Sequence, residues 1–236
     1  MATIYSKENI LYCQYADGTT TELSALKNYI MEDIKIEDVD FVDFPLDLVT
    51  LNFDLQTIGH LHCPLLEVIE GDTYIKNVTK MGFPLLYKTI GNLYVRKIEE
   101  LHLPALLEAN TIIVEGDIKI NLPQMRSHTD IYALESSEIN TPSKGRVFCT
   151  SKCTHLNCPN ATIIKDDTIT CINKHIYKIQ STEQLDDLTT YLICTNYDDP
   201  SDIIHALEYN NTINVYGATL QEAQELLDQR KKEEQQ

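Results

Sequence analysis

Prolines recur along this chain at a nearly constant interval. Seven of the eight prolines are separated by 17 to 20 residues and lie at positions 45, 64, 84, 104, 123, 142 and 159. Prolines that mark unrelated turns would not keep such an interval. A fixed period of about 20 residues is typical of repeat proteins, in which similar coils stack on one another. The spacing therefore predicts a solenoid, in which each coil buries its apolar face only against its neighbours.

The residues around the prolines repeat as well. An apolar residue precedes the proline and leucines follow it in LHCPLLEVI (61–69), GFPLLYKTI (82–90) and LHLPALLEA (101–109). A glycine-containing turn and a short alternating segment come next, in GDTYIK (71–76), GNLYVR (91–96) and GDIKIN (116–121), with weaker copies at 128–133, 145–150 and 167–172. Alternation of apolar and polar residues predicts a short strand with one buried face.

Placing one such strand in each coil gives a parallel ladder with two inward-facing columns of side chains. The first column is predicted to contain Thr73, Leu93, Ile118, Ile131, Val147 and Ile169. The second is predicted to contain Ile75, Val95, Ile120, Ala133, Cys149 and Cys171. Both columns are apolar or small, as residues buried between neighbouring coils must be.

The two ends of the chain do not follow the repeat. Strands are predicted at 33–38, 190–195 and 212–217. Helical spacing and capping residues predict helices within 18–31, at 181–188, at 199–207 and from residue 218, the last with Leu220, Ala223, Leu226 and Leu227 on its apolar side. We expect the terminal helices to cover the open first and last coils. Docking away from the solenoid is the alternative.

Together these patterns predict an α/β repeat solenoid, a parallel β-strand ladder of about 20-residue coils with helical end segments. The expected divisions are a strand and helix cap over 1–43, the repeat solenoid over 44–180, helix–strand repeats with a C-terminal capping helix over 181–229, and a polar tail over 230–236.

The coils resemble the leucine-rich-repeat superfamily in its irregular branches, the receptor L-domain and BspA-like types. The likeness lies in LHCPLLEVIEGDTYIKNV (61–78), in GFPLLYKTIGNLYVRKI (82–98) and in the helix–strand units near the C-terminus, and it spans residues 40–216. No unit matches the strict L-x-x-L-x-L-x-x-N pattern and no regular asparagine ladder is expected, so a more angular β-solenoid is the alternative. The resemblance implies recognition of other proteins on the exposed face of the parallel sheet, and it implies no catalysis.

The outward-facing column between the two inward ones collects aromatic and cationic residues. It is predicted to contain Tyr74, Tyr94, Lys119, Tyr132, Phe148 and Thr170, with Lys76, Arg96 and Asn121 one step further out. Tyrosine and arginine are residue types that often anchor protein interfaces. The candidate partner-binding residues are Tyr74, Lys76, Tyr94, Arg96, Lys119 and Tyr132. The alternative is that the tyrosines merely cover a pleated sheet.

The chain is strongly acidic, with 36 acidic and 19 basic residues and a net charge of −17. This charge argues against general nucleic-acid binding and against attraction to anionic membranes, since both need cationic surfaces. The acids are concentrated at the two ends of the chain, where solvated carboxylates maintain solubility. The sharper interpretation is an acidic surface that mimics nucleic acid, formed by Asp38, Asp40, Asp43, Asp198, Asp199 and Asp202.

No residue pattern in the chain indicates catalysis or metal binding. Cys149, Cys153, His155 and Cys158 have the spacing C-x3-C-x-H-x2-C, which differs from the paired C-x-x-C knuckles of zinc sites. Cys158 precedes a repeat proline and Cys149 belongs to an inward column, so we expect buried thiols. No catalytic triad, phosphate-binding loop, dinucleotide fingerprint or metalloprotease motif is recognisable. We expect no enzymatic activity, no metal and no cofactor.

The remaining features bear on location and partners. No apolar run approaches the ~20 residues that span a bilayer, the first ten residues lack a basic-then-apolar signal, and seven cysteines indicate free thiols in a reducing compartment. We expect a cytoplasmic protein that binds neither nucleic acid nor membranes directly.

Three functional hypotheses follow from these residues. The first is a non-enzymatic recognition solenoid that binds a partner protein through its sheet face. The second is an acidic inhibitor that occupies the basic groove of a nucleic-acid-binding protein, for example in viral or mobile-element anti-defence. The third is a structural subunit that docks through its C-terminal helix.

Overall fold

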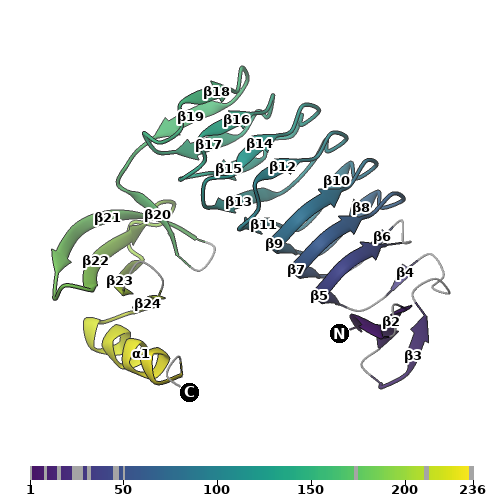
Figure 1. Ribbon diagram of the computed structural model, residues 1–236. Helices are drawn as coiled ribbons and strands as arrows, with labels where there is room; N and C mark the ends of the chain where they lie inside the picture. Colours follow the sequence, from purple (N-terminus) through teal and green to yellow (C-terminus); the bar gives the residue numbers. More distant parts are fainter. Residues whose placement is uncertain are drawn as a thin grey trace. The chain divides into compact units, whose positions relative to one another are not determined.

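The structure is a computed structural model that describes residues 2–7, 10–14, 17–22, 29–30, 33–44, 48–49, 51–172, 175–209 and 213–233. The chain divides into two compact units, Met1–Lys165 and Asp166–Gln236. The first unit contains parallel β-ladders, and the second contains an antiparallel sheet with a helix (Figure 1). The predicted solenoid therefore ends at Lys165 and does not extend to residue 180.

The first unit is a parallel β-solenoid of about seven turns, as the proline interval predicts. Its long ladder is formed, from the last coil to the first, by β19 (Thr162–Lys165), β17 (Arg146–Cys149), β15 (Asp130–Tyr132), β13 (Thr111–Glu115), β11 (Leu93–Arg96), β9 (Thr73–Gly82), β7 (Phe53–His62) and β5 (Ile34–Asp43). β1 (Ala2–Lys7) pairs with β5 in parallel, and β2 (Ile10–Gln14) and β3 (Thr20–Glu22) follow as antiparallel strands.

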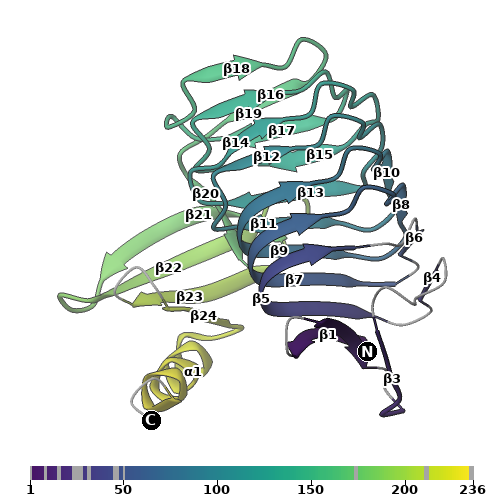
Figure 2. The same cartoon turned by 45° about the vertical axis from the view of Figure 1, so that its right-hand side comes forward.

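Two shorter parallel ladders complete the coils, and Figure 2 shows the stacked strands. The second ladder contains β12 (Glu100–His102), β14 (Lys119–Asn121), β16 (Glu138–Asn140) and β18 (His155–Asn157). The third contains β4 (Tyr29–Ile30), β6 (Leu48–Val49), β8 (Val68–Ile69) and β10 (Lys88–Thr89). In the earlier coils, β5, β7 and β9 are each ten residues long. Both halves of each strand pair with a neighbouring coil, so each strand continues through the bend at which its coil leaves the long ladder.

A left-handed residue bends each of five successive coils, those of β5, β7, β9, β11 and β13, where it leaves the long ladder. The backbone angle φ is 54° at Asp38, 52° at Thr57, 59° at Asn77 and 54° at Lys97, and Gly116 follows 19 residues after Lys97 with a φ of 101°. Residues with a side chain rarely adopt this conformation. Its recurrence at one position of successive coils indicates that the stacking of the coils imposes it.

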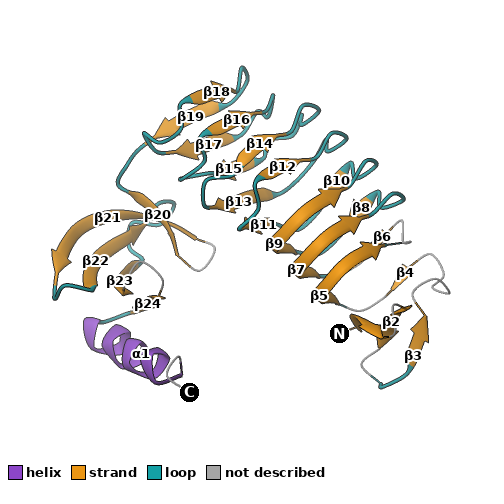
Figure 3. Cartoon of the chain, in the orientation of Figure 1, coloured by secondary structure: helices purple, strands orange, loops and turns teal. Residues whose placement is uncertain are grey.

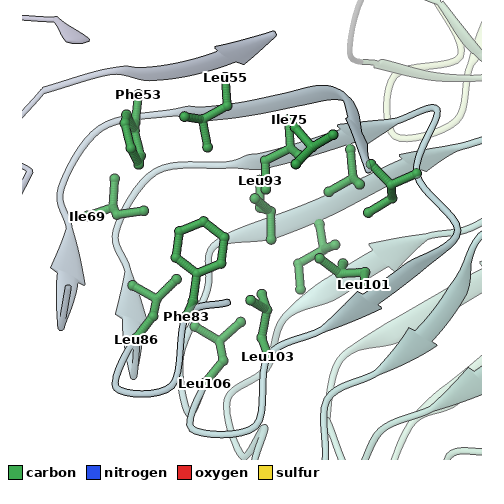
Figure 4. Close-up of a cluster of buried hydrophobic side chains, with 14 of the residues drawn as sticks. Phe53, Leu55, Ile69, Ile75, Phe83, Leu86, Leu93, Leu101, Leu103 and Leu106 are labelled. Atoms are coloured by element: carbon green, nitrogen blue, oxygen red, sulfur yellow. The ribbon is translucent and has the colours of Figure 1, made fainter. Parts of the chain in front are cut away.

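The prolines mark the next bend, directly after the second ladder. The residues that precede four of these prolines are buried, and they are Cys63, Phe83, Leu103 and Leu122. The residues two positions after the same prolines are also buried, and they are Leu66, Leu86, Leu106 and Met125. Figure 4 shows several of these side chains pointing into the coil together with residues of the long ladder, such as Leu55, Ile75 and Leu93. Burial of each such side chain contributes roughly 1.5–3 kcal/mol.

The register of the long ladder differs from the prediction at β13 and β19 and agrees with it at β15 and β17. The first inward column contains Thr73, Leu93, Ile112, Ile131, Val147 and Ile163. The second contains Ile75, Val95 and Val114, and Ala133 and Cys149 are buried in later coils. Ile118 and Ile120 were assigned wrongly, because they lie beside and within β14 of the second ladder. The cause is Gly116, which occupies the left-handed corner, whereas Gly91 lies in the turn before its strand.

Polar side chains form two ladders that join successive coils, although the sequence predicts no regular asparagine ladder. Asn157 Nδ2 donates to Asn140 Oδ1 at 2.8 Å, and Asn140 Nδ2 donates to Asn121 Oδ1 at 2.9 Å. Asn121 Nδ2 in turn lies 3.0 Å from His102 Nδ1. The other ladder lies just before the long-ladder strands and contains Asp33, Asn52, Asp72 and Asn92. Each of the first three side chains accepts a hydrogen bond from the backbone amide of the next of these four residues, which lies one coil further along the chain. These bonds add polar cross-links between coils whose apolar faces are already buried.

The second unit is an antiparallel sheet of five consecutive strands with a helix on it. The strands are β20 (Ile169–Ile172), β21 (His175–Gln184), β22 (Thr189–Asn196), β23 (Ile203–Tyr209) and β24 (Ile213–Gly217), and the helix is α1 (Leu220–Glu233). Ala223 and Leu227 of α1 form a buried cluster with Leu207 and Val215 of the sheet. Ile169 and Cys171 were assigned to the solenoid wrongly, since β20 pairs antiparallel with β21. The strands predicted at 190–195 and 212–217 are confirmed as β22 and β24.

Two of the predicted helices, at 181–188 and 199–207, are wrong, as Figure 3 makes visible. The segments 181–188 and 199–207 form strands and hairpin turns. Ser181, at the start of the first segment, lies within β21, and an aspartate forms an Asx turn in each segment. Asp186 Oδ1 accepts a hydrogen bond from the amide of Leu188 at 2.8 Å, and Asp199 Oδ1 accepts one from the amide of Ser201 at 3.1 Å. Within 18–31, β3 and β4 are strands, and residues 23–28 lie outside the described residues.

The predicted C-terminal helix is present as α1 and belongs to the second unit. It begins with a capping box, in which Thr219 Oγ1 accepts from the amide of Glu222 at 3.2 Å and Glu222 Oε2 accepts from the amide of Ala218 at 2.9 Å. It continues to Glu233, into the segment predicted as a polar tail. Among the described residues, α1 is the one helix, and it lacks the length and apolar character that crossing a membrane requires.

Candidate functional site

The outward side of the long ladder brings four of the six predicted partner-binding residues together. Tyr74 on β9 lies directly opposite Tyr94 on β11, and Lys76 on β9 lies directly opposite Arg96 on β11. The left-handed corner follows Lys76 and Arg96 at the next residue, so the four side chains occupy the last outward positions before the bend. We refer to Tyr74, Lys76, Tyr94 and Arg96 as the tyrosine site.

The two tyrosine rings of this site are stacked. Their centroids are 4.9 Å apart and their planes differ by 9°. The Tyr74 hydroxyl donates to Asp72 Oδ2 at 3.2 Å, and both tyrosines are half-buried. An aromatic pair contributes about 0.5–1.5 kcal/mol beyond the burial of its area. Parallel pairing therefore holds the two rings in a single orientation in the absence of any ligand.

The charged residues of the site differ from those of the preceding coils. Lys76 and Arg96 are exposed, and Arg96 Nε lies 3.6 Å from Glu115 Oε2 on β13. In the same columns, Lys35 Nζ pairs with Glu37 on β5, and Gln56 Nε2 donates to the carboxylate of Asp54 on β7. In these columns, Lys35 and Asp54 therefore have partners within their own strands, whereas β9 and β11 present cations.

Tyr132, a third predicted tyrosine of the column, is not accessible. It is 8% exposed, and Phe148, against which it stacks with a centroid distance of 4.5 Å, is 0% exposed. Ile113, the residue between Tyr94 and Tyr132 in the column, is also buried. The guanidinium of Arg146 lies 5.1 Å from the Phe148 ring centroid. Of the aromatic residues predicted in the outward column, Tyr74 and Tyr94 are therefore the accessible ones.

Lys119, the remaining predicted residue, lies on another ladder. β14 pairs Lys119 with Glu100 of β12. Its predicted place opposite Tyr94 is taken by Ile113, a residue that the glycine spacing did not predict there. Gly116 differs from the other repeat glycines because it follows its strand, and the apolar run Ile112, Ile113 and Val114 is the sequence signal that marks that strand.

The predicted acidic surface draws residues from both units. Asp38, Asp40 and Asp43 are exposed on β5, and Asp198, Asp199 and Asp202 lie between β22 and β23. Asp202 Oδ2 accepts hydrogen bonds from Tyr177 at 3.3 Å and from Asn196 at 3.1 Å. Hydrogen bonds from Ser201 lower the pKa of the Asp199 carboxyl. In the second unit Asp199 and Asp202 accept hydrogen bonds, whereas on β5 Asp38 and Asp40 are exposed and Asp43 Oδ1 lies 3.0 Å from His62 Nδ1 of β7.

Burial determines the properties of the cysteines near residue 150. Cys149 is buried and Cys158 is half-buried, and desolvation raises the pKa of each thiol to about 11. Cys153 is buried and its Sγ lies 3.9 Å from the carbonyl oxygen of His155. Among the described residues, no group of three or more His, Cys, Asp and Glu side chains is arranged to hold a metal ion. The side chain of Cys171 lies outside the described residues.

Comparison of the chain with protein families, with curated proteins and with solved structures finds no match. The resemblance to leucine-rich repeats therefore stays a prediction.

Proposed function

We propose that this protein is a non-enzymatic recognition solenoid that binds a partner protein through the tyrosine site. The observation that carries the proposal is the in-register pairing of two stacked tyrosines and two exposed cations on adjacent strands. Aromatic residues and arginine contribute most of the binding energy in many protein interfaces. Residues on a rigid ladder lose little conformational freedom on binding, which favours affinity.

The experiment is affinity capture from an extract of the source cells, washed at about 0.15 M and at about 0.5 M salt. The immobilised proteins are the wild type, the double variant Tyr74→Ala/Tyr94→Ala and the control Tyr87→Ala. Tyr87 is 40% exposed and lies beside β10 of the third ladder, so its variant removes an exposed ring without touching the tyrosine site. We expect a partner that binds the wild type and Tyr87→Ala at both salt concentrations and is lost from the double variant.

The same capture separates the acidic-mimic hypothesis from the proposal. The variant for this purpose is Asp38→Asn/Asp40→Asn/Asp43→Asn, which neutralises the exposed carboxylates of β5. A nucleic-acid-binding protein that leaves at high salt, is lost from this triple variant and still binds Tyr74→Ala/Tyr94→Ala would contradict the proposal. Circular dichroism of each variant establishes that the solenoid is intact.

A further inference from the structure

A cationic segment interrupts this acidic chain at the tyrosine site. From Thr73 to Ile98 the sequence contains five basic residues and no acidic residue, although the net charge of the chain is −17. The segment comprises β9, β10 and β11. The net charge does not describe the electrostatic potential here, because exposed charges act over a Debye length of about 8–10 Å.

Much of this positive charge is not compensated by neighbouring carboxylates. Lys88 is paired with Glu108 at 2.8 Å, and Arg96 has Glu115 at the longer distance of 3.6 Å. Lys76 and Lys97 are exposed, and neither forms an ion pair with a carboxylate in the described part of the chain. Lys97 follows Arg96 directly at the left-handed corner. Three cations therefore lie together beside the stacked tyrosines.

We infer that the ligand of the tyrosine site is an acidic peptide segment of the partner, which places an apolar or aromatic side chain against Tyr74 and Tyr94 and carboxylates opposite Lys76, Arg96 and Lys97. This inference rests on the proposed function and specifies the class of its partner. Charge complementarity selects the occupant, since carboxylates are the groups that arginine and lysine bind in proteins.

The spacing of the site restricts the peptide further. Tyr74 and Lys76, like Tyr94 and Arg96, are two residues apart on one strand, which corresponds to about 6.6–6.8 Å. In an extended peptide, side chains two residues apart lie on the same face at this same distance. A peptide that runs along the strands therefore matches the site with an apolar or aromatic residue and an acidic residue at positions i and i+2, in either order.

Nucleic acid fits the same surface less well. The two cationic strands, β9 and β11, are only about 4.8 Å apart. The columns of the tyrosine site continue into Asp54 on β7 and Glu37 on β5 in one direction, and into Glu115 on β13 in the other. A phosphodiester chain that crossed the coils would meet these carboxylates. The facing sides of Tyr74 and Tyr94 are already in contact with each other, which removes two of the four ring faces on which bases stack.

The test uses the full chain and a phage-displayed library of random peptides of about 12 residues. Selected peptides are sequenced, synthesised with a fluorophore and titrated by fluorescence anisotropy. The variants are Lys76→Glu/Arg96→Glu and the control Lys119→Glu/Lys144→Glu, which changes the net charge by the same amount at two exposed lysines outside the tyrosine site. Tyr74→Ala/Tyr94→Ala and a labelled oligothymidylate of about 20 nucleotides complete the set.

We expect the selected peptides to share an acidic residue two positions from an apolar or aromatic residue. Lys76→Glu/Arg96→Glu should weaken their binding about tenfold or more, and the control variant should weaken it less than about threefold. Peptides without acidic residues, equal binding by the charge-reversed variant, or no selection above background would overturn the inference. So would oligothymidylate binding that depends on Lys76 and Arg96.

The outcomes also separate the inference from the proposed function. Peptides that bind the wild type, lose affinity for Tyr74→Ala/Tyr94→Ala and keep it for Lys76→Glu/Arg96→Glu would leave the tyrosine site as the binding surface and remove the acidic class of partner. Peptides that bind all of these variants equally would count against both.

Discussion

Side-chain hydrogen bonds join different kinds of neighbours in the two units. In the solenoid they connect coils, as where Asn140 donates to Asn121, 19 residues earlier. In the second unit many of them close local turns, as where Asp186 accepts from the amide of Leu188, two residues later, and others join distant parts of the sheet, as where Tyr177 donates to Asp202. A coil of the solenoid therefore depends on its neighbouring coils, whereas a hairpin of the second unit is closed by its own turn.

This difference predicts how the stability of each unit responds to a substitution. In a stacked solenoid the stability is close to a sum over coils and the interfaces between them. In the antiparallel unit, the sheet packs on α1 around a cluster that includes Leu207 and Leu227, and a second buried cluster of the sheet includes Cys194 and Ala206. Three substitutions and a change of pH test whether the stability of the two units depends on different contacts. They are given from the largest expected effect to the smallest.

The largest effect should come from a core side chain that faces neighbouring coils. Phe83 is 1% exposed, and Phe83→Ala should lower the free energy of unfolding of the first unit by about 3–5 kcal/mol. Leu85→Ala, at a 46% exposed position in the same coil, is the control and should cost less than about 1 kcal/mol. Hydrogen exchange with mass spectrometry reports each unit separately. An equal loss of protection in residues 166–236 would show that the units unfold together.

Close stacking of the coils predicts the next effect. A Cβ atom at Gly91 would lie 2.3 Å from the carbonyl oxygen of Gly71 in the preceding coil. Gly91→Ala should therefore lower stability by about 1–3 kcal/mol, measured from the urea midpoint. The control is Gly82→Ala, whose Cβ would meet its nearest atom, Cδ2 of His62, at an ordinary 3.5 Å. Equal urea midpoints for the two variants would mean that the coils can move apart at Gly91 without a loss of stability.

The left-handed corner predicts a gain in stability. Thr57 has a φ of 52°, a conformation that glycine adopts without a steric penalty. Thr57→Gly should raise the free energy of unfolding by about 0.5–1 kcal/mol, since relief of strain exceeds the extra chain entropy. Thr79→Gly, at an exposed position of β9 that follows the corner, should lower it by about 0.5–1 kcal/mol. Destabilisation by both changes would show that the corner carries no strain.

Acid should act mainly on the turns of the second unit. Hydrogen bonds from Thr168, Leu188 and Ser201 lower the pKa values of Asp166, Asp186 and Asp199 from the ordinary 3.8. A lowered pKa in the folded state means that the ionised group stabilises the fold above about pH 4 and that this contribution disappears as the pH falls through the lowered value.

Hydrogen exchange at about pH 6 and about pH 3 measures this acid response. Asp186→Ala/Asp199→Ala should reduce the acid-induced loss of protection, and Asp187→Ala, which removes a charge from the same turn as Asp186, should not. A stronger acid response in the solenoid would reverse the comparison.

The proline interval predicted the solenoid because every coil bends at the same place, directly after its second strand. The same local evidence failed for the register of the coil that contains β13, since glycine serves two purposes in this chain. Gly91 permits close approach of two coils, whereas Gly116 occupies a left-handed corner. The helix predicted at 199–207 was wrong for a related reason, because an aspartate that closes an Asx turn has the same local sequence as a helix cap. The helix predicted at 181–188 was wrong because its first four residues pair with β22 as part of β21.

For the candidate site, alternation within each strand was sufficient to place Tyr74 beside Lys76 and Tyr94 beside Arg96. It could not show that Tyr132 is buried or that Lys119 belongs to another ladder. Alternation tells which side of a strand a residue occupies, and it contains no information on what covers that side.

The sequence by itself determined that the chain repeats every 17 to 20 residues, that its coils contain parallel strands and that tyrosines and cations share an outward face on two of them. Only the tertiary structure decided which strands lie side by side, where the parallel solenoid gives way to an antiparallel sheet and which part of the aromatic column is accessible. The physical reason is that periodicity is a property of neighbouring residues, whereas register and exposure depend on which distant segments pack together.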